Sequence, residues 1–307
     1  MLGAGLGTRL RPLTDSRPKP LVPIFQKPLI TFALDHLIAA GVGEFVINTH
    51  HLASQFEELF GSGEYRGHRV ALSHEPDLLE TGGGIKRAQN LIGDQPFIVY
   101  SGDILTDIDI GALVDEHFQH GNEVTLALRD TGFAPSIGFR DGLVTDIRKG
   151  LGSEGRYDFA NVSVWNPSIF ERIPAGEKIS FVPILVDWIA RGGRVGGVVL
   201  NERGWFNIGS RKEYLDVHRT IFSGGWLPSY LTDPGWPKAI SPSACVAATA
   251  SIRGFSVVGA GAEIGDQVEL NDTIVWDHAK IASRANLESC IVRDGRRAEG
   301  ILRAADI

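Results

Sequence analysis

The sequence predicts an α/β fold in two parts, a doubly wound domain followed by a short left-handed parallel β-helix. Helix-like and strand-like segments alternate from residue 28 to about residue 130, which is typical of a parallel sheet with helices on both faces. Four prolines then interrupt residues 224–243, and such a cluster predicts a linker. Beyond the linker, apolar residues recur every six positions, the period of one face of a β-helix.

The first part of the chain carries regular segments in alternating order. Residues 28–38 place apolar side chains at helical spacing, with Pro28 in the first turn and Gly41 just past the end. By the same criteria we expect further helices over residues 52–60, 85–91 and 110–118, and strands over residues 44–49, 69–72, 97–100 and 124–128.

Residues 131–210 have shorter elements. We expect strands over residues 159–165 and 195–200 and a helix over residues 181–190, forming an insertion that walls one side of a cleft. A last helix over residues 211–222 precedes two glycines. The predicted domain boundaries are therefore 1–223 for the α/β domain, 224–243 for the linker and 244–307 for the tail.

Apolar residues in the tail fall in phase with one another, at Val246, Ile252, Val258, Ile264 and Leu270. A six-residue step is one face of a triangular coil, in which each coil buries one apolar residue per face. A small β-sandwich would alternate every second residue instead. The tail therefore predicts hexapeptide repeats, and we expect its cysteines, Cys245 and Cys290, to be small buried fillers.

Composition excludes several classes of protein. Of 307 residues, 43% are hydrophobic and 22% charged, close to the soluble averages of about 45–50% and about 25%. Apolar runs stay well short of the roughly 18 residues that a membrane helix needs, so we expect no membrane partner. The two cysteines do not form a disulfide framework and favour a reducing cytoplasm.

The charge is unevenly distributed. The net charge is −7, yet residues 1–27 contain five basic residues and one acidic residue. Nucleic acid usually meets a broad basic face, so we expect no nucleic-acid partner. A short basic segment is better suited to a small, concentrated anion such as a phosphate group.

That basic segment also holds the densest motif of the chain, Gly3-Ala4-Gly5-Leu6-Gly7-Thr8-Arg9, followed by Arg17-Pro18-Lys19-Pro20. Closely spaced glycines let backbone N–H groups face an anion without interference from a Cβ atom. The P-loop is excluded because Gly-Lys-Ser/Thr is absent. The dinucleotide fingerprint is excluded because Thr8 occupies the position of its third glycine.

On these residues the chain resembles the sugar-1-phosphate nucleotidyltransferases. Their signature, Leu-Ala-Ala-Gly-x-Gly-Thr-Arg-Leu-x-Pro-Leu-Thr followed by Pro-Lys-Pro-Leu, is matched by residues 2–21, with Gly3 in place of the first alanine. The resemblance continues through residues 80–84, the Ser101-Gly102-Asp103 turn and residues 205–209, and some members carry a hexapeptide tail. It implies a Rossmann-like nucleotidyltransferase domain that converts an NTP and a sugar 1-phosphate to an NDP-sugar and pyrophosphate.

The resemblance implies roles for individual residues. Arg9 would draw off the leaving pyrophosphate, and Lys19 would hold the α-phosphate between the attacking and leaving oxygens. Lys149 and Asn161 would lie at the sugar phosphate, where Arg148 replaces a glutamate of the family and Asn161 a frequent glycine. The expected nucleotide-binding residues are Leu2, Gly3, Ala4, Gly5, Gly7 and Thr8 around the phosphates, and Thr81, Gly82 and Gly83 at the base and ribose.

A Mg²⁺ site is expected at Asp103, which follows a buried strand. In open α/β sheets the carboxyl ends of strands face the ligand crevice, and Mg²⁺ prefers oxygen ligands. Resemblance adds Asn207 as the second ligand, in place of the family's usual aspartate. His50 and His51 are adjacent and point apart, so we interpret them as polar loop residues rather than metal ligands.

Several alternatives stay open. The tail resembles that of mannose-1-phosphate guanylyltransferases and favours GTP, whereas residues 80–85 resemble uridylyltransferases that use UTP and N-acetylmuramate 1-phosphate. Asn207 and Arg148 also motivate a regulatory subunit that binds an NDP-sugar without turnover. A homo-oligomer through the open end of the β-helix is a further expectation. The family places a buried strand ahead of its signature, so we expect that strand to lie upstream of Met1.

Overall fold

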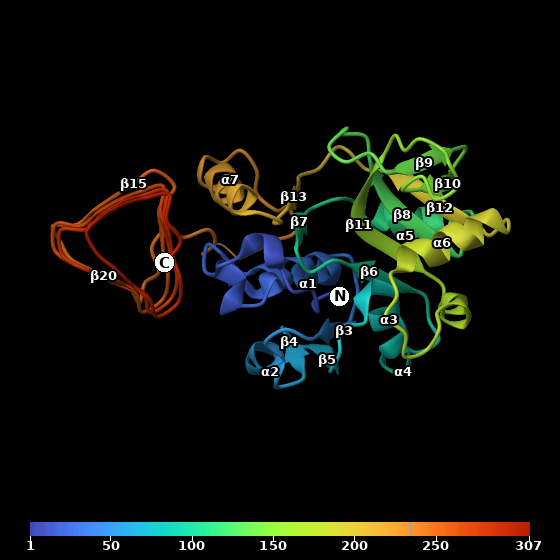
Figure 1. Ribbon diagram of the computed structural model, residues 1–307, viewed down its shortest axis with the longest axis horizontal. Coiled ribbons are helices and arrows are strands. Elements are labelled where there is room, and N and C mark those ends of the chain that lie inside the picture. Colours follow the sequence, from blue (N-terminus) through green and yellow to red (C-terminus); the bar gives the residue numbers. More distant parts are fainter. Residues whose placement is uncertain (234) are drawn as a thin grey trace. The chain divides into compact units, whose positions relative to one another are not determined.

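The computed structural model describes residues 1–233 and 235–307 (Figure 1). Pro234, in the predicted linker, lies outside the described residues. Contacts group the chain into two compact units. Unit 1 comprises Met1–Leu6, Pro18–Pro20 and Phe32–Asn207, and unit 2 comprises Gly7–Arg17, Leu21–Thr31 and Ile208–Ile307. The domain boundaries predicted from the sequence stay a prediction.

The helices lie close to where the sequence predicts them, except that α3 and α4 replace the single helix predicted over residues 85–91. Their bounds are α1 (Leu29–Ala39), α2 (Ala53–Phe60), α3 (Glu80–Arg87), α4 (Gln89–Ile92), α5 (Ile110–Gln119), α6 (Phe181–Ala190) and α7 (Arg211–Phe222). Short 3-10 helices span Thr8–Leu10, Leu13–Asp15, Lys19–Leu21 and Pro167–Arg172. None of these described helices is both long and apolar enough to cross a membrane.

Unit 1 is built on two sheets. The smaller has the order β3-β5-β4, with β3 and β5 parallel, and the larger has the order β6-β11-β8-β12-β10-β9. The strands of these sheets are β3 (Glu44–Thr49), β4 (Glu64–Tyr65), β5 (His68–His74), β6 (Phe97–Tyr100), β8 (Val124–Arg129), β9 (Ile137–Arg140), β10 (Leu143–Ile147), β11 (Asp158–Trp165) and β12 (Val195–Val199). A separate antiparallel pair joins β7 (Ile104–Thr106) to β13 (Trp205–Asn207).

The larger sheet is mixed rather than parallel throughout. Strand β12 runs parallel to β8, but β11 lies between β6 and β8 and is antiparallel to both. The strand predicted over residues 159–165 is confirmed as β11, which is an inner strand next to the edge strand β6, and the cleft wall expected from residues 131–210 stays a prediction. Strand pairing between distant segments is set by tertiary packing, which an alternation of elements along the chain does not reveal.

The core of unit 1 explains why these segments form strands and helices. Val124, Leu126 and Leu128 of β8 are at most 1% exposed, and they pack with Trp165 of β11 and Leu185 of α6. Burial of such side chains contributes roughly 1.5–3 kcal/mol each.

The first residues of the chain lie between the two sheets. Leu2 forms parallel bridges to Asn48, at the end of β3, and to Ser101, just after β6. A cavity of about 430 Å³ lies beside Met1, lined largely by apolar side chains of β3, β6 and the helices near them. The strand expected ahead of Leu2 stays a prediction.

Unit 2 contains the β-helix, whose triangular coils are visible in Figure 1. Its parallel sheets have the orders β14-β17-β20-β23, β15-β18-β21-β24 and β16-β19-β22. The strands are β14 (Cys245–Val246), β15 (Ser251–Arg253), β16 (Val257–Val258), β17 (Glu263–Ile264), β18 (Glu269–Asn271), β19 (Ile274–Val275), β20 (Lys280–Ile281), β21 (Asn286–Glu288), β22 (Ile291–Val292), β23 (Arg297–Ala298) and β24 (Ile301–Arg303). The hairpin β1 (Pro23–Ile24) and β2 (Lys27–Pro28) also belongs to this unit.

The six-residue repeat of apolar residues is confirmed as the core of the β-helix. Val258, Ile264 and Leu270 are at most 3% exposed. Cys290 is buried as expected, but Cys245 is exposed, so that expectation was wrong. Successive side chains of a strand point to opposite sides, and Val246 occupies the core-forming repeat position next to Cys245.

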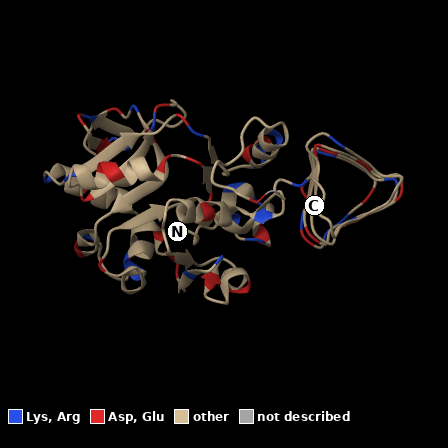
Figure 2. Ribbon diagram, turned by 180° about the vertical axis from the view of Figure 1, so that it is seen from behind, with Lys and Arg blue, Asp and Glu red and all other residues tan. Residues whose placement is uncertain are grey.

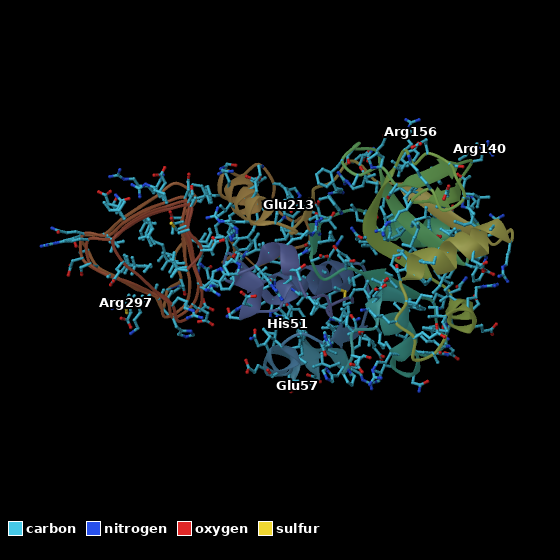
Figure 3. All side chains as sticks on the ribbon, in the orientation of Figure 1. His51, Glu57, Arg140, Arg156, Glu213 and Arg297 are labelled. Carbon is cyan, nitrogen blue, oxygen red and sulfur yellow. The ribbon has the colours of Figure 1, made fainter. Side chains whose placement is uncertain are left out.

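Charged residues form rows on the outside of the β-helix. Glu263, Lys280 and Arg297 pair in register on successive coils, and Lys280 Nζ lies 2.8 Å from Glu263 Oε1. Figure 2 shows both signs of charge on the coils, and Arg297 is labelled in Figure 3. Such exposed pairs contribute little to stability, so the apolar interior determines this fold.

Candidate functional site

The glycine-rich segment enters unit 1 between β3 and β6. Gly3 N donates to Asn48 Oδ1 over 2.7 Å, and its backbone approaches so closely that an added Cβ would lie 2.8 Å from the Asn48 carbonyl oxygen. Gly5 is exposed, and a Cβ there would have no neighbour within 4 Å. Gly3 is therefore required by packing, whereas the open space at Gly5 could admit a ligand.

The segment continues into unit 2 with Gly7, whose φ of 63° favours glycine. The Gly7 carbonyl oxygen accepts hydrogen bonds from Thr14 Oγ1, over 2.9 Å, and from Leu10 N. These contacts fix the turn that precedes Thr8–Leu10 and leave Arg9 exposed. An exposed guanidinium next to a fixed turn can bind a phosphate group.

Lys19 and Asp103, two side chains of unit 1, form an ion pair. Lys19 Nζ lies 2.5 Å from Asp103 Oδ2, and the Lys19 residue is only 7% exposed. Asp103 is positioned by the turn after β6, where Ile104 N donates to the Ser101 carbonyl oxygen. The structure thus brings together two residues that the sequence analysis assigned to different tasks.

Asn207 lies close in register to Asp103, although not directly opposite it. It ends β13 and is paired with Ile104, the residue after Asp103. A carboxylate oxygen and an amide oxygen would then serve as a small set of hard donors, as Mg²⁺ requires when phosphates and water supply the remaining ligands. The residues fit such an ion, and the described residues contain no group of three or more His, Cys, Asp or Glu side chains that could hold another.

Thr81, Gly82 and Gly83 lie in the first turns of α3. Thr81 Oγ1 accepts from Phe181 N over 3.1 Å, and the N–H groups of both glycines donate to the Ile179 carbonyl oxygen. A Cβ on Gly83 would lie 2.3 Å from the Glu177 carbonyl oxygen. Close packing against residues 177–181 thus explains why glycine occupies these positions. This explanation is separate from the expected contact with a base.

The residues expected at the sugar phosphate adopt special backbone conformations. Arg148, Lys149 and Asn161 have φ values of 54°, 60° and 63°. Lys149 is exposed and pairs with Glu154 at 2.7 Å. Asn161 lies where the β11 register shifts, and asparagine tolerates this left-handed region better than most residues. That tolerance explains how asparagine occupies a position that is often glycine.

A pair of buried aromatic residues lies beneath the glycine-rich segment. Burial raises the pKa of Tyr100 well above its usual range and lowers the pKa of His36 to about 4. His36 Nδ1 lies 3.3 Å from the Tyr100 hydroxyl, and the Tyr100 carbonyl oxygen accepts from Leu2 N over 2.8 Å. Both side chains therefore stay neutral at pH 7 and act as fixed support for the segment.

Sequence reasoning missed two residues, Glu75 and Asn48. Both are buried, with exposures of 0% and 6%, and they contact each other beneath Gly3. Asn48 lies near the end of β3 and Glu75 directly follows β5, and a polar residue at such a place is easily interpreted as part of a loop. The signal that could have revealed Glu75 is a carboxylate just after the predicted strand over residues 69–72, five residues before Glu80-Thr81-Gly82-Gly83.

Comparisons with known proteins agree with the fold and identify relatives of this chain. Residues 1–139 match the family model described as nucleotidyl transferase. The chain is 37% identical over 189 residues to N-acetylmuramate alpha-1-phosphate uridylyltransferase of Neisseria meningitidis, covering 60% of this chain and 82% of that protein. It is 28% identical over 298 residues to mannose-1-phosphate guanylyltransferase of Mycobacterium tuberculosis, covering 94% of this chain and 82% of that protein.

A solved structure shares the fold. The inositol-1-phosphate CTP transferase of T. maritima superposes with a TM-score of 0.60 at 18% identity, over 69% of this chain and 89% of that one. The family model and the identity to the uridylyltransferase define the class of this protein, a nucleotidyltransferase. The chain belongs to the family of sugar-1-phosphate nucleotidyltransferases.

Proposed function

We propose that this protein catalyses Mg²⁺-dependent transfer of a nucleotidyl group from an NTP to a sugar 1-phosphate, most like a mannose-1-phosphate guanylyltransferase. A sugar phosphate oxygen attacks the α-phosphorus, the bond to the bridging oxygen breaks, and pyrophosphate leaves with the electron pair. The observation that carries the proposal is the Lys19–Asp103 pair, with Asn207 in the adjacent register position.

Charge placement supports the roles proposed for these side chains. Lys19 is nearly buried, so its ammonium interacts with a charge more strongly than it would in water. When a phosphate is present, this ammonium would steady the α-phosphate, and Arg9 would bind the departing pyrophosphate. Asp103 and Asn207 would hold a Mg²⁺ ion, which when bound neutralises charge on the phosphates.

Of the two relatives described above, the guanylyltransferase matches more of this chain. The similarity to the Mycobacterium tuberculosis mannose-1-phosphate enzyme covers 94% of this chain, whereas that to the Neisseria meningitidis uridylyltransferase covers 60%. Similarity to the first relative therefore reaches the hexapeptide repeats. On this basis we propose GTP and mannose 1-phosphate as the first substrates to test.

A second candidate is a uridylyltransferase acting on N-acetylmuramate 1-phosphate or a related sugar. It is favoured by the higher identity, 37%, to the Neisseria meningitidis enzyme. The Glu80-Thr81-Gly82-Gly83 turn, which begins α3, is part of the motif that suggested this class.

Pyrophosphate release with the full chain, four NTPs and a panel of sugar 1-phosphates tests the proposal. We expect GTP with mannose 1-phosphate to give the highest kcat/KM and omission of Mg²⁺ to abolish turnover. Highest activity with UTP and N-acetylmuramate 1-phosphate would support the second candidate. Binding of NDP-sugars without turnover for any pair would contradict both and favour a regulatory subunit.

A homo-oligomer through the tail also belongs to the proposal. Strand β24 pairs with β21, and Ile301 on it is 75% exposed. An exposed apolar residue on an end coil can pack against a second copy. A monomeric mass in solution at assay concentrations would contradict this part.

A further inference from the structure

We propose that Glu75 is a positioning residue that sets both the glycine-rich segment and the start of α3, the two parts of the chain expected to hold the nucleotide. The inference rests on the proposed function. Glu75 follows β5 directly, is 0% exposed, and has both carboxylate oxygens engaged within unit 1. Being inaccessible, it would act through its neighbours rather than on a substrate.

One carboxylate oxygen orients Asn48. Glu75 Oε1 accepts from Asn48 Nδ2 over 2.7 Å, and Asn48 Oδ1 accepts from Gly3 N over 2.7 Å. An asparagine amide has one donor side and one acceptor side. Because a carboxylate can only accept, it forces the NH₂ group of Asn48 toward itself and turns the oxygen toward Gly3.

The other oxygen orients the entry to α3. Glu75 Oε2 accepts from Leu79 N over 2.9 Å, just ahead of the helix that begins with Glu80. The backbone of Glu75 is fixed as well, because its N–H donates to the Thr49 carbonyl oxygen and its carbonyl lies 2.8 Å from His50 Nδ1. A single side chain therefore connects Gly3 to the turn that carries Thr81.

The space around this group is closed. A Cβ on Gly84 would lie 2.4 Å from Glu75 Oε1 and 2.7 Å from Asn48 Nδ2. Only a carboxylate of this length supplies two acceptors here. In a glutamine at this position, the NH₂ group would face another donor, either Asn48 Nδ2 or Leu79 N. Two donors cannot bond to each other, so a buried polar group would be left unpaired.

The polarity of this chain of hydrogen bonds allows a reciprocal test. In Glu75→Gln alone one hydrogen bond is lost, and in Asn48→Asp alone two carboxylates face each other. When both substitutions are combined, the new glutamine could accept from Leu79 N and donate to the new aspartate. That aspartate could still accept from Gly3 N, so all three bonds return.

We expect each single variant to raise the KM for NTP about tenfold or more, with little change in the KM for the sugar phosphate. We expect the double variant to bring the KM for NTP most of the way back to the wild-type value.

Asp158→Asn provides the matched control. Asp158 is also a buried carboxylate with both oxygens accepting, from Ala134 N on one side and from Phe133 N and Thr131 Oγ1 on the other. It contacts none of the residues assigned to the nucleotide. We expect this variant to leave the KM for NTP unchanged even if it lowers thermal stability.

Amide hydrogen exchange gives a readout that needs no substrate. In Glu75→Gln we expect faster exchange in peptides that contain Gly3 and Leu79, and recovery in the double variant. Unchanged exchange, an unchanged KM for NTP, or failure of the double variant to recover would overturn the inference. A changed order of preference among the four NTPs would also overturn it, by showing direct contact with the base. Absence of turnover in the wild type would contradict the proposed function, while exchange would still test the hydrogen bonds.

Discussion

The side chain of Lys19 forms its ion pair with Asp103 in a partly buried environment. The Lys19 side chain is 9% exposed and the Asp103 side chain is 33% exposed. A nearly buried ammonium is costly to desolvate unless it is paired. Asp103 supplies that pairing in the structure, and a phosphate would supply more negative charge at the same place. The same lysine can therefore be stabilised by its own protein and still be available to a nucleotide.

Replacing Lys19 with alanine tests this role. Loss of one aimed charge should lower kcat by a factor on the order of 10² or more, as measured by pyrophosphate release. Lys280→Ala is the control, because Lys280 pairs with Glu263 on the outside of the β-helix. Turnover by Lys19→Ala equal to that of the control would remove Lys19 from the mechanism.

Buried histidines predict how stability depends on pH. Burial lowers the pKa of His36 and of His218 to about 4, from 6.5. Protons therefore bind the unfolded chain more tightly, so the stability from neutral imidazoles is present above pH 6.5 and is lost as the pH falls toward 4. Between pH 7 and pH 5 we expect the free energy of unfolding to fall by on the order of 2 kcal/mol for each histidine. Chemical denaturation at these pH values measures it, and equal stability at pH 7 and pH 5 would contradict it.

The glycine-rich segment combines two kinds of glycine within three residues. Gly3 has no room for a Cβ, because the Asn48 carbonyl oxygen and the side chains of Ile47 and Phe56 lie too close. Gly5 has open space around it and an ordinary backbone conformation. Packing within the fold explains glycine at position 3. At position 5 the open space is explained by the expected binding of a ligand.

Alanine at each position should separate the two. Gly3→Ala should lower the melting temperature, since backbone of β3 must shift to accept the new methyl group. Gly5→Ala should melt like the wild type but bind NTP more weakly, because its methyl group would occupy the space of the phosphates. Calorimetry and the KM for NTP measure the two effects. A Gly5→Ala enzyme with the wild-type KM would show that the phosphates lie elsewhere.

Elements with local end signals were predicted well. Helices α6 and α7 begin and end where the sequence predicts, because Ser180 and Ser210 cap them and Glu213 (Figure 3) returns to the cap of α7. Helix α3 begins at Glu80, five residues before the predicted start. Three glycines make that turn a poor helix in isolation, and contacts with residues 177–181 stabilise it.

The site was predicted in part, for a similar reason. Lys19 and Asp103 were singled out individually, but their ion pair joins residues 84 positions apart, and no local pattern reveals it. Asn48 and Glu75 were missed because their importance arises only from contacts with Gly3 and Leu79. Long-range hydrogen bonds of this kind depend on the completed sheet.

Unit 2 joins the hexapeptide repeats to part of the signature. Arg17 lies 2.7 Å from Asp294 and 5.4 Å over the Trp276 ring, and Arg293 donates to the Pro12 carbonyl oxygen over 3.1 Å. These contacts hold both ends of residues 12–17, close in sequence to Arg9. The tail thus has a structural link to the segment expected to handle pyrophosphate.

Removing that link should impair turnover. In the double variant Arg293→Ala and Asp294→Ala, we expect residues 7–17 to exchange amide hydrogens faster and kcat to fall on the order of tenfold. Glu263→Ala is the control, because Glu263 belongs to the outer charged row of the same β-helix. Wild-type turnover in the double variant would show that the tail folds and acts independently of the signature.

A crystal structure with an NTP analogue and Mg²⁺ would test most directly where the nucleotide binds. We predict that its phosphates lie along the backbone of residues 3–7, with Lys19 at the α-phosphate and Arg9 at the terminal pair. A nucleotide bound at another place, with residues 3–19 unchanged and without a phosphate contact, would contradict the assignment of this segment.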